Sequence, residues 1–163
     1  MSMDRTAKVV GGLALAAVLF SGCLKTEEFP NTPAIKFKSF DFFGDSASLT
    51  ISFTDGDGDI GLDPADNAPP FDTASTFYYN LFLEQSQKVN GVWQVVEFEI
   101  PIHYRIPRIT PTGQNKALEG EVAVAIDPYP LFIVGDTVRY SVEMVDRALN
   151  RSNKVFSDEI IVP

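Results

Sequence analysis

The sequence has little of the residue types on which many enzyme and metal sites depend. It contains one Cys and one His among 163 residues. One Cys excludes a disulfide within the chain, a cysteine-based zinc site and a redox pair, and one His excludes any site that needs two imidazoles. Basic residues are also scarce, since 13 Lys and Arg stand against 22 Asp and Glu, a formal net charge of −9. This excess of acid disfavours a nucleic acid partner, whose phosphates would be repelled.

Long hydrophobic runs are also lacking. The longest extends from Val9 to Phe20, directly after Arg5 and Lys8. Its length, about 12 residues, suits the apolar region of a secretory signal peptide and is too short to span about 30 Å of hydrocarbon. The sequence therefore predicts an exported protein.

The run ends in Leu19-Phe20-Ser21-Gly22-Cys23. This segment resembles a bacterial lipobox, in which small residues precede a Cys that is acylated and becomes the mature N-terminus, although Phe20 stands where an aliphatic residue is usual. The resemblance implies a lipoprotein signal peptide over residues 1–22, lipidation of Cys23 and attachment to the bacterial outer membrane. The alternative is an ordinary signal peptide followed by an incidental Cys.

The residues after Cys23 predict a tether. Leu24-Lys25-Thr26-Glu27-Glu28 is similar to the export signal of Bacteroidota lipoproteins that face the cell exterior, and the alternative is a solvated linker. Pro30 and Pro33 disfavour a helix, so we expect residues 23–33 to hold the domain away from the membrane.

The remainder, residues 34–163, is predicted to be one all-β domain. Hydrophobic residues make up 45% of the chain, enough for one packed core. Alternation with a period of two recurs between turn residues, and no window sustains helical spacing. Asn90-Gly91 is the strongest hairpin signal, because both residues tolerate positive φ. Strands are expected over residues 35–43, 48–54, 76–89, 92–100, 102–109 at an edge, 117–126, 137–146 and 154–162.

One segment near the C-terminus carries a family resemblance. Val134 to Asp146 looks like the penultimate strand of fibronectin type III and related immunoglobulin-like domains, and Asp146 to Ser152 resembles the loop that follows it, with Leu149 in place of a glycine. With residues 102–109 counted as a continuation of the strand before them, the expected strands number seven, and the resemblance implies that they form an antiparallel β-sandwich. It also implies that Tyr140 is a corner tyrosine whose hydroxyl bonds back to the preceding turn.

Acidic residues gather between Lys38 and Lys88, where no basic residue occurs. The interval holds nine acids: Asp41, Asp45, Asp55, Asp57, Asp59, Asp63, Asp66, Asp72 and Glu84. Asp55, Asp57 and Asp59 alternate with glycines, so their carboxylates can converge on one hard cation, and calcium suits such oxygen ligands best. We expect Asp63 to contribute as well. The alternative is a solvated Asp-Gly turn without an ion.

The expected sandwich supplies further ligands. Its topology places the connections at residues 55–75, 110–116 and 147–153 at one end. Asp146 and Asn150 are therefore predicted to face Asp55, Asp57 and Asp59 and to complete a calcium site that ties the loops together.

Other motifs favour structural roles. His103 lies in the predicted edge strand without a nucleophilic serine motif, and alternation places Glu97 and Glu99 on one solvated face of a strand. The aromatic residues Tyr78, Tyr79, Trp93 and Phe98 are expected to divide between the core and a surface, where a platform for sugars or a partner protein is the alternative to ordinary cross-strand pairs.

The sequence thus predicts a non-catalytic, lipid-anchored, calcium-stabilised β-sandwich that serves as a binding or structural module on the cell surface. Its predicted partners are the membrane, through Cys23, and a surface protein or glycan. The first alternative is an accessory glycan-binding lipoprotein of a nutrient-uptake system. The second is a metal-dependent hydrolase that uses the acidic loop.

Overall fold

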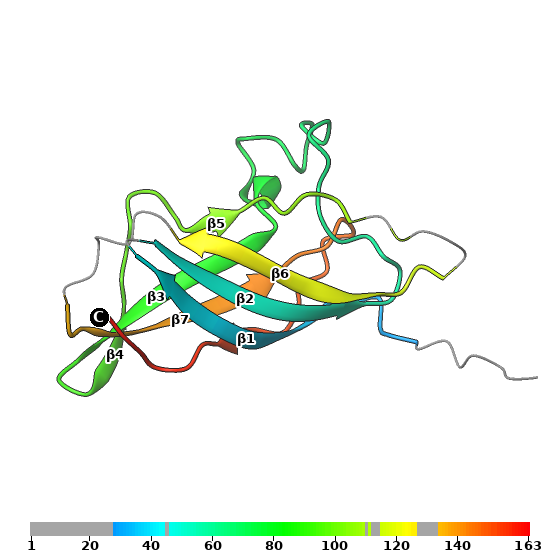
Figure 1. Cartoon of the computed structure of the whole chain (residues 1–163). Helices are drawn as coiled ribbons and strands as arrows, with labels where there is room; N and C mark the ends of the chain where they lie inside the picture. The colour runs from blue at the N-terminus through cyan, green and yellow to red at the C-terminus, as the bar shows by residue number, and fades with distance from the viewer. Residues whose placement is uncertain (1–27, 45, 110, 112–114, 127–133) are drawn as a thin grey trace, which may run out of the picture.

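The structure is a computed structural model (Figure 1). It describes residues 28–163 except 45, 110, 112–114 and 127–133. The predicted signal peptide of residues 1–22, the lipidation site Cys23 and the first residues of the tether therefore lie outside the described residues. Within the described part, no helix has the length and the apolar character needed to cross a bilayer.

The described residues form two antiparallel sheets, as the all-β prediction requires, and contain no α-helix. The three-stranded sheet has the order β1 (Ala34–Phe43), β2 (Ser46–Asp55), β6 (Leu118–Ile126). The six-stranded sheet has the order β4 (Val92–Val95), β3 (Leu81–Val89), β7 (Thr137–Met144), β8 (Val155–Phe156), with β5 (His103–Tyr104) paired to β3 and β9 (Ile160–Ile161) paired to β7. Figure 1 shows the two sheets lying over each other as a β-sandwich.

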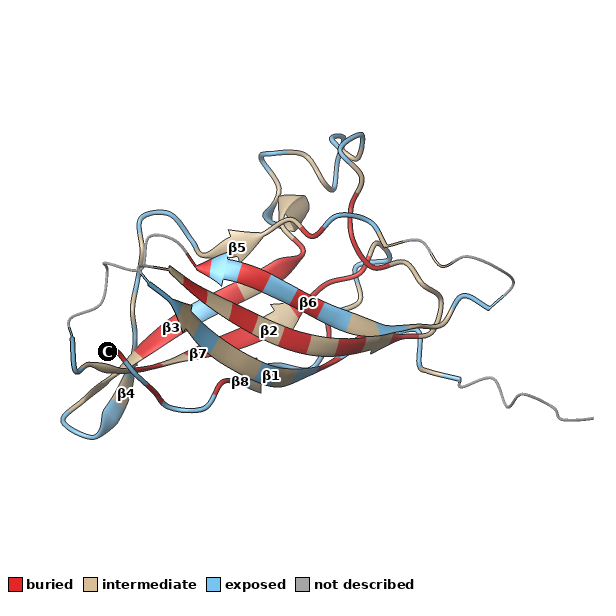
Figure 2. Ribbon diagram, viewed as in Figure 1, coloured by how far each residue is buried: buried red, intermediate tan, exposed pale blue. Residues whose placement is uncertain are grey.

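The core lies between the sheets and follows from alternation. Along β2 every second side chain is buried, and the same alternation on β7 buries Val138, Tyr140, Val142 and Met144 (Figure 2). These side chains join one apolar cluster drawn from both sheets. Burying an aliphatic or aromatic side chain contributes about 1.5–3 kcal/mol, so this cluster is the main source of stability.

The predicted hairpin at Asn90-Gly91 is confirmed. Both residues have positive φ, 51° and 81°, and β3 pairs with β4 on either side of them. β1 and β2 are joined by a tight turn between the paired residues Phe43 and Ser46, where Gly44 has a positive φ of 61°.

Two strands are shorter than predicted. Residues 76–89 begin with a short 3₁₀ helix, η1 (Thr76–Tyr78), which the Ser75 side chain caps by accepting a hydrogen bond from the Phe77 N–H. The strand starts only at Leu81, because the buried Asn80 side chain bonds the backbone N–H and C=O of Ile106. The strand predicted over residues 92–100 ends at Val95, and the Val96 N–H makes one more bond to β3, to the Gln85 carbonyl oxygen at 2.9 Å.

The last strands also differ from the prediction. Of residues 102–109, only β5 pairs with a neighbouring strand, and it does so at the expected edge, beside the same strand β3 that β4 flanks. The segment predicted over residues 154–162 is divided into β8 and β9. Ser157 causes the division, because its hydroxyl accepts the hydrogen bond of the Tyr140 N–H in place of a backbone carbonyl.

Strand ends also move at three other places. β2 runs over Ser46–Asp55 instead of residues 48–54, and β6 begins at Leu118. β7 ends at Met144 instead of Asp146, because the Ser152 hydroxyl accepts the hydrogen bond of the Met144 N–H. The loops after β2 and β7 contact each other, since the Arg147 N–H donates to the Asp59 carbonyl oxygen.

Candidate metal centre

Asp55, the last residue of β2, shapes the loop that follows it. The residue is fully buried, and its Oδ2 accepts hydrogen bonds from the backbone N–H groups of Gly58 at 2.8 Å and Asp59 at 3.1 Å. These bonds fold the chain back over its own carboxylate, as short acidic side chains do in turns. The other oxygen, Oδ1, is buried and has no hydrogen-bond partner.

The folded loop brings together three carboxylates, which we call the aspartate cluster: Asp55, Asp57 and Asp59. One carboxylate oxygen from each lies within 4.8 Å of the others. Among the described residues five buried side-chain atoms lack a hydrogen-bond partner, and three of these are the Oδ1 atoms of the cluster. A buried carboxylate oxygen without a donor is costly, so three in one place call for a cation.

The loop after β7 lies against the cluster, as the sequence predicts. The backbone N–H of Ala148 donates to Asp59 Oδ2 at 3.0 Å, and the N–H of Arg147 donates to the Asp59 carbonyl oxygen at 3.2 Å. Asp146 is buried nearby, but both of its oxygens accept hydrogen bonds from Asn150, from the backbone N–H at 2.7 Å and from Nδ2 at 2.8 Å. Asp146 therefore contributes negative charge rather than a free oxygen.

Burial and like charge shift the titration of the cluster. The pKa of Asp59 is raised to about 6, first by burial and then by the neighbouring charges of Asp146, Asp57 and Asp55. Burial also raises the pKa of Asp55, with the charges of Asp57 and Asp146 adding to it and the loop hydrogen bonds opposing it. Both shifts mean that the ionised cluster is unfavourable without a positive partner.

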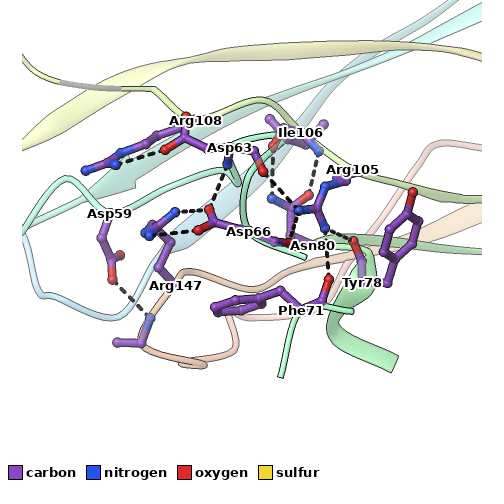
Figure 3. A network of polar contacts seen from close by, with 11 residues as sticks. Asp59, Asp63, Asp66, Phe71, Tyr78, Asn80, Arg105, Ile106, Arg108 and Arg147 are labelled. Carbon is purple, nitrogen blue, oxygen red and sulfur yellow. Dashed lines mark hydrogen bonds and ion pairs between the residues drawn. The ribbon is translucent and has the colours of Figure 1, made fainter. Parts of the chain in front are cut away.

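The nearby arginines are occupied elsewhere (Figure 3). Arg147 pairs with Asp66, and Arg108 pairs with Asp63 at 3.0 Å. The structure thus leaves Asp63 outside the aspartate cluster, and Asn150 is engaged with Asp146. Of the six residues predicted as calcium ligands, Asp55, Asp57 and Asp59 are the three whose carboxylates converge.

Two glycines let other segments approach the loop. A methyl group on Gly56 would lie 2.2 Å from the Phe29 carbonyl oxygen, and the Gly56 N–H donates to the Pro30 carbonyl oxygen at 2.9 Å. A methyl group on Gly58 would lie 2.3 Å from the carbonyl oxygen of Lys116. The loop is thus packed between the end of the tether and the segment before β6.

Sequence reasoning missed Arg105, which organises the long acidic loop. Its guanidinium donates to the Tyr78 and Asp66 carbonyl oxygens at 2.6 Å, to the Asp63 carbonyl oxygen at 3.1 Å and to the Phe71 carbonyl oxygen at 3.5 Å (Figure 3). It also lies over the Tyr78 ring. Acceptors that belong to the main chain leave no pattern in side-chain identity, so no signal in the sequence could have found them.

The remaining candidates lie away from the cluster. The His103 ring packs edge-on against Tyr79 and Phe82, and Glu97 and Glu99 are exposed. Tyr140 is fully buried and its hydroxyl bonds Gln85 Oε1 of β3 at 3.2 Å, whereas the family resemblance implied a bond to the preceding turn, part of which lies outside the described residues.

The donor set of the aspartate cluster is made of oxygen alone. Calcium accepts several carboxylate oxygens in flexible geometry, whereas zinc prefers nitrogen or sulfur and magnesium keeps most of its water. The residues present therefore suit calcium. Comparison of the chain with protein-family models, with curated proteins and with solved structures finds no match.

Proposed function

We propose that this chain is a non-catalytic, lipid-anchored β-sandwich module of the bacterial cell envelope whose aspartate cluster binds calcium. The observation that carries the proposal is the set of three buried, unpartnered Oδ1 atoms on Asp55, Asp57 and Asp59. Calcium between them would offset the burial and the mutual repulsion that together raise the pKa of Asp59. It would also fasten the loop after β2 to the loop after β7, which already touch through Asp59 and Ala148.

The strand arrangement supports the resemblance to immunoglobulin-like and fibronectin type III domains. One sheet combines the first two strands with β6, and the other places β3 beside β7, with the C-terminal strands on the far side of β7. This is the division of strands expected of such a sandwich, with the third strand beside the penultimate one. In that architecture the loops at one end commonly carry the binding function, and here that end holds the aspartate cluster.

Thermal unfolding tests calcium binding directly. We expect calcium at a hundred times its dissociation constant to add about 2.7 kcal/mol to the free energy of unfolding, which for a domain of this size raises Tm by about 10 °C. Magnesium should give a smaller rise. The D63N variant is the matched control, because Asp63 pairs with Arg108 outside the cluster. A Tm that does not change across a calcium titration would refute the site.

The lipid anchor needs a separate test. Mass spectrometry of the protein purified from a bacterial host should find acyl chains on Cys23 and no residues before it. A C23S variant should lose the acyl chains and leave the detergent phase on phase separation. Digestion of intact cells by an added protease distinguishes a protein facing the exterior from one facing the periplasm. Retention of the C23S variant in the membrane fraction would contradict the anchor.

A further inference from the structure

Arg139 on β7 points away from the core and lies between two aromatic rings. Its Cζ is 4.4 Å from the centre of the Trp93 ring and 4.8 Å from the centre of the Phe156 ring. The rings come from β4 and β8, which flank the β3–β7 pair in the strand order, so the guanidinium is held by stacking from both. Its Nε is buried and has no acceptor among the described residues.

The other arginines that the structure describes all have oxygen partners. Arg105 bonds four carbonyl oxygens, and Arg108, Arg147 and Arg151 each pair with a carboxylate. Within the described part of the chain, the contacts of the Arg139 guanidinium are with its two rings, and its Nε has no acceptor. A guanidinium offers five donors in a planar fork that matches a carboxylate, so this one is ordered and still lacks its usual ligand.

Three other basic side chains described on the face around Arg139 each pair with a carboxylate. On the same face of the six-stranded sheet, Lys88 pairs with Glu159, Lys154 with Glu84 and Arg151 with Glu143. Arg139 therefore differs from these neighbours in having no carboxylate partner among the described residues, in a chain whose formal net charge is −9. A ligand that complements the Arg139 guanidinium would carry a negatively charged group.

The neighbours of that charge are apolar and exposed. By strand register Val95, Phe156 and Ile161 lie on the same face as Arg139, and they are 61%, 51% and 68% exposed. An arginine and a tryptophan ringed by aliphatic and aromatic side chains have the composition of a protein–protein contact. A sugar would need more hydroxyl-binding groups than these side chains supply, so a protein partner fits better.

We propose that Arg139 is the centre of a docking surface for a partner protein, whose Asp or Glu side chain binds the guanidinium while its apolar neighbours cover Val95, Phe156 and Ile161. The two rings fix the guanidinium before the partner arrives, which lowers the entropy lost on binding. The inference identifies the contact through which the proposed module would bind a surface protein. It does not depend on calcium, because Arg139 lies near the start of β7 and the aspartate cluster adjoins the loop after its end.

Trp93 makes the proposal testable, because it is the only Trp in the chain and lies on Arg139. The probe is a capped pentapeptide, Val-Glu-Val-Asp-Val, titrated into the purified protein while Trp93 emission is recorded. We expect a saturable change in emission. The matched peptide with Gln and Asn in place of Glu and Asp should bind at least about tenfold more weakly, since it lacks the charge-assisted hydrogen bond.

Variants separate Arg139 from the general charge of the face. R139Q should weaken peptide binding at least about tenfold, whereas R151Q, which removes a paired arginine from the same face, should leave it within about twofold. R139K keeps the charge without the planar fork of the guanidinium and should also weaken peptide binding. It replaces R139Q in the test if circular dichroism shows that R139Q is unfolded.

Three results would overturn the proposal: no saturable response to the acidic peptide, an equal response in R139Q or R139K, or tighter binding of an oligouronate than of the peptide. Each titration is run with calcium and with chelator. If the protein does not bind the peptide but calcium still raises its Tm, the docking surface alone is refuted. If the protein binds the peptide but calcium does not raise its Tm, the calcium site alone is refuted.

Discussion

The Oδ2 atom of Asp59 accepts a hydrogen bond from the backbone N–H of Ala148 at 3.0 Å, although 89 residues separate the two in the chain. This bond joins the loop after β2 to the loop after β7. The other oxygen of Asp59 is buried and has no donor. A cation bound there would therefore act on both loops at once, and the following predictions test that arrangement and its surroundings.

Two substitutions at Asp55 separate its structural role from its charge. D55N keeps an oxygen that can accept from the Gly58 and Asp59 N–H groups, so we expect the calcium-free protein to be at least as stable as the wild type while the calcium-dependent rise in Tm disappears. D55A loses both bonds and should destabilise the protein by about 1–3 kcal/mol with or without calcium. Differential scanning fluorimetry measures the Tm of each variant with and without calcium. A calcium-dependent rise in the Tm of D55N as large as that of the wild type would contradict the prediction.

The pKa of Asp59 predicts an unusual pH dependence without calcium. Its folded-state pKa of about 6 exceeds the ordinary value of 3.8, so the folded protein holds this proton more tightly. The stabilisation from protonation is complete below about pH 4 and is lost as pH rises through about 6. We expect the Tm of the chelated protein to increase from pH 7 to pH 5.

Calcium should reverse that slope, because protons compete with the metal for the carboxylates. D59N removes the titrating group and serves as the control, since its slope in chelator should be flatter than that of the wild type. If the Tm of the chelated wild-type protein changed between pH 7 and pH 5 no differently from that of D59N, this would be evidence against the raised pKa of Asp59.

Arg105 should be the most important arginine for stability. R105Q removes donors from four backbone carbonyls of the loop between β2 and β3, and we expect a loss of about 2 kcal/mol or more in urea unfolding. R108Q, which breaks one exposed ion pair with Asp63, should cost less than about 1 kcal/mol. Equal losses of unfolding free energy in R105Q and R108Q would show that the hydrogen bonds of Arg105 stabilise the protein no more than one exposed ion pair does.

Gly56 should control the contact between the tether and the loop. A G56A side chain would meet the Phe29 carbonyl oxygen at 2.2 Å, so the backbone of the tether must move away. The Gly56 N–H then loses its acceptor, Pro30, and residue 56 should exchange its amide hydrogen faster in deuterated water. G44A is the control for a strained substitution away from the tether, because alanine is disfavoured at the Gly44 φ of 61° but its methyl group meets nothing within 4 Å. Unchanged exchange at residue 56 would refute the contact.

Local signals accounted for much of the fold. The Asn90-Gly91 hairpin and the alternation along β2 and β7 depend on neighbours in the sequence, and both appear in the structure. The same is true of the convergence of Asp55, Asp57 and Asp59, because the alternating glycines act within a single loop. Such features need no knowledge of what packs against them.

The features that escaped prediction depend on distant main chain or on a single hydroxyl. Ser157 interrupts the last strand because its side chain replaces a carbonyl opposite Tyr140, and nothing in an alternating pattern marks that exchange. In the sequence Asp63 is indistinguishable from the other acids of the loop, and its pairing with Arg108 depends on the tertiary structure. The amide of Ala148 and the carbonyl of Pro30 carry no side-chain signature at all.

The crowding at Gly56 and Gly58 bears on how this loop can diverge in evolution. Any mutation that adds a side chain at either position pushes it into the main chain of another segment. Replacing Asp57 by Asn, in contrast, removes a charge and hardly changes the size of the side chain. Descendants of this gene should therefore lose the acidic residues more readily than the glycines between them. A lineage that had abandoned the ion would still be recognisable by the spacing of those glycines.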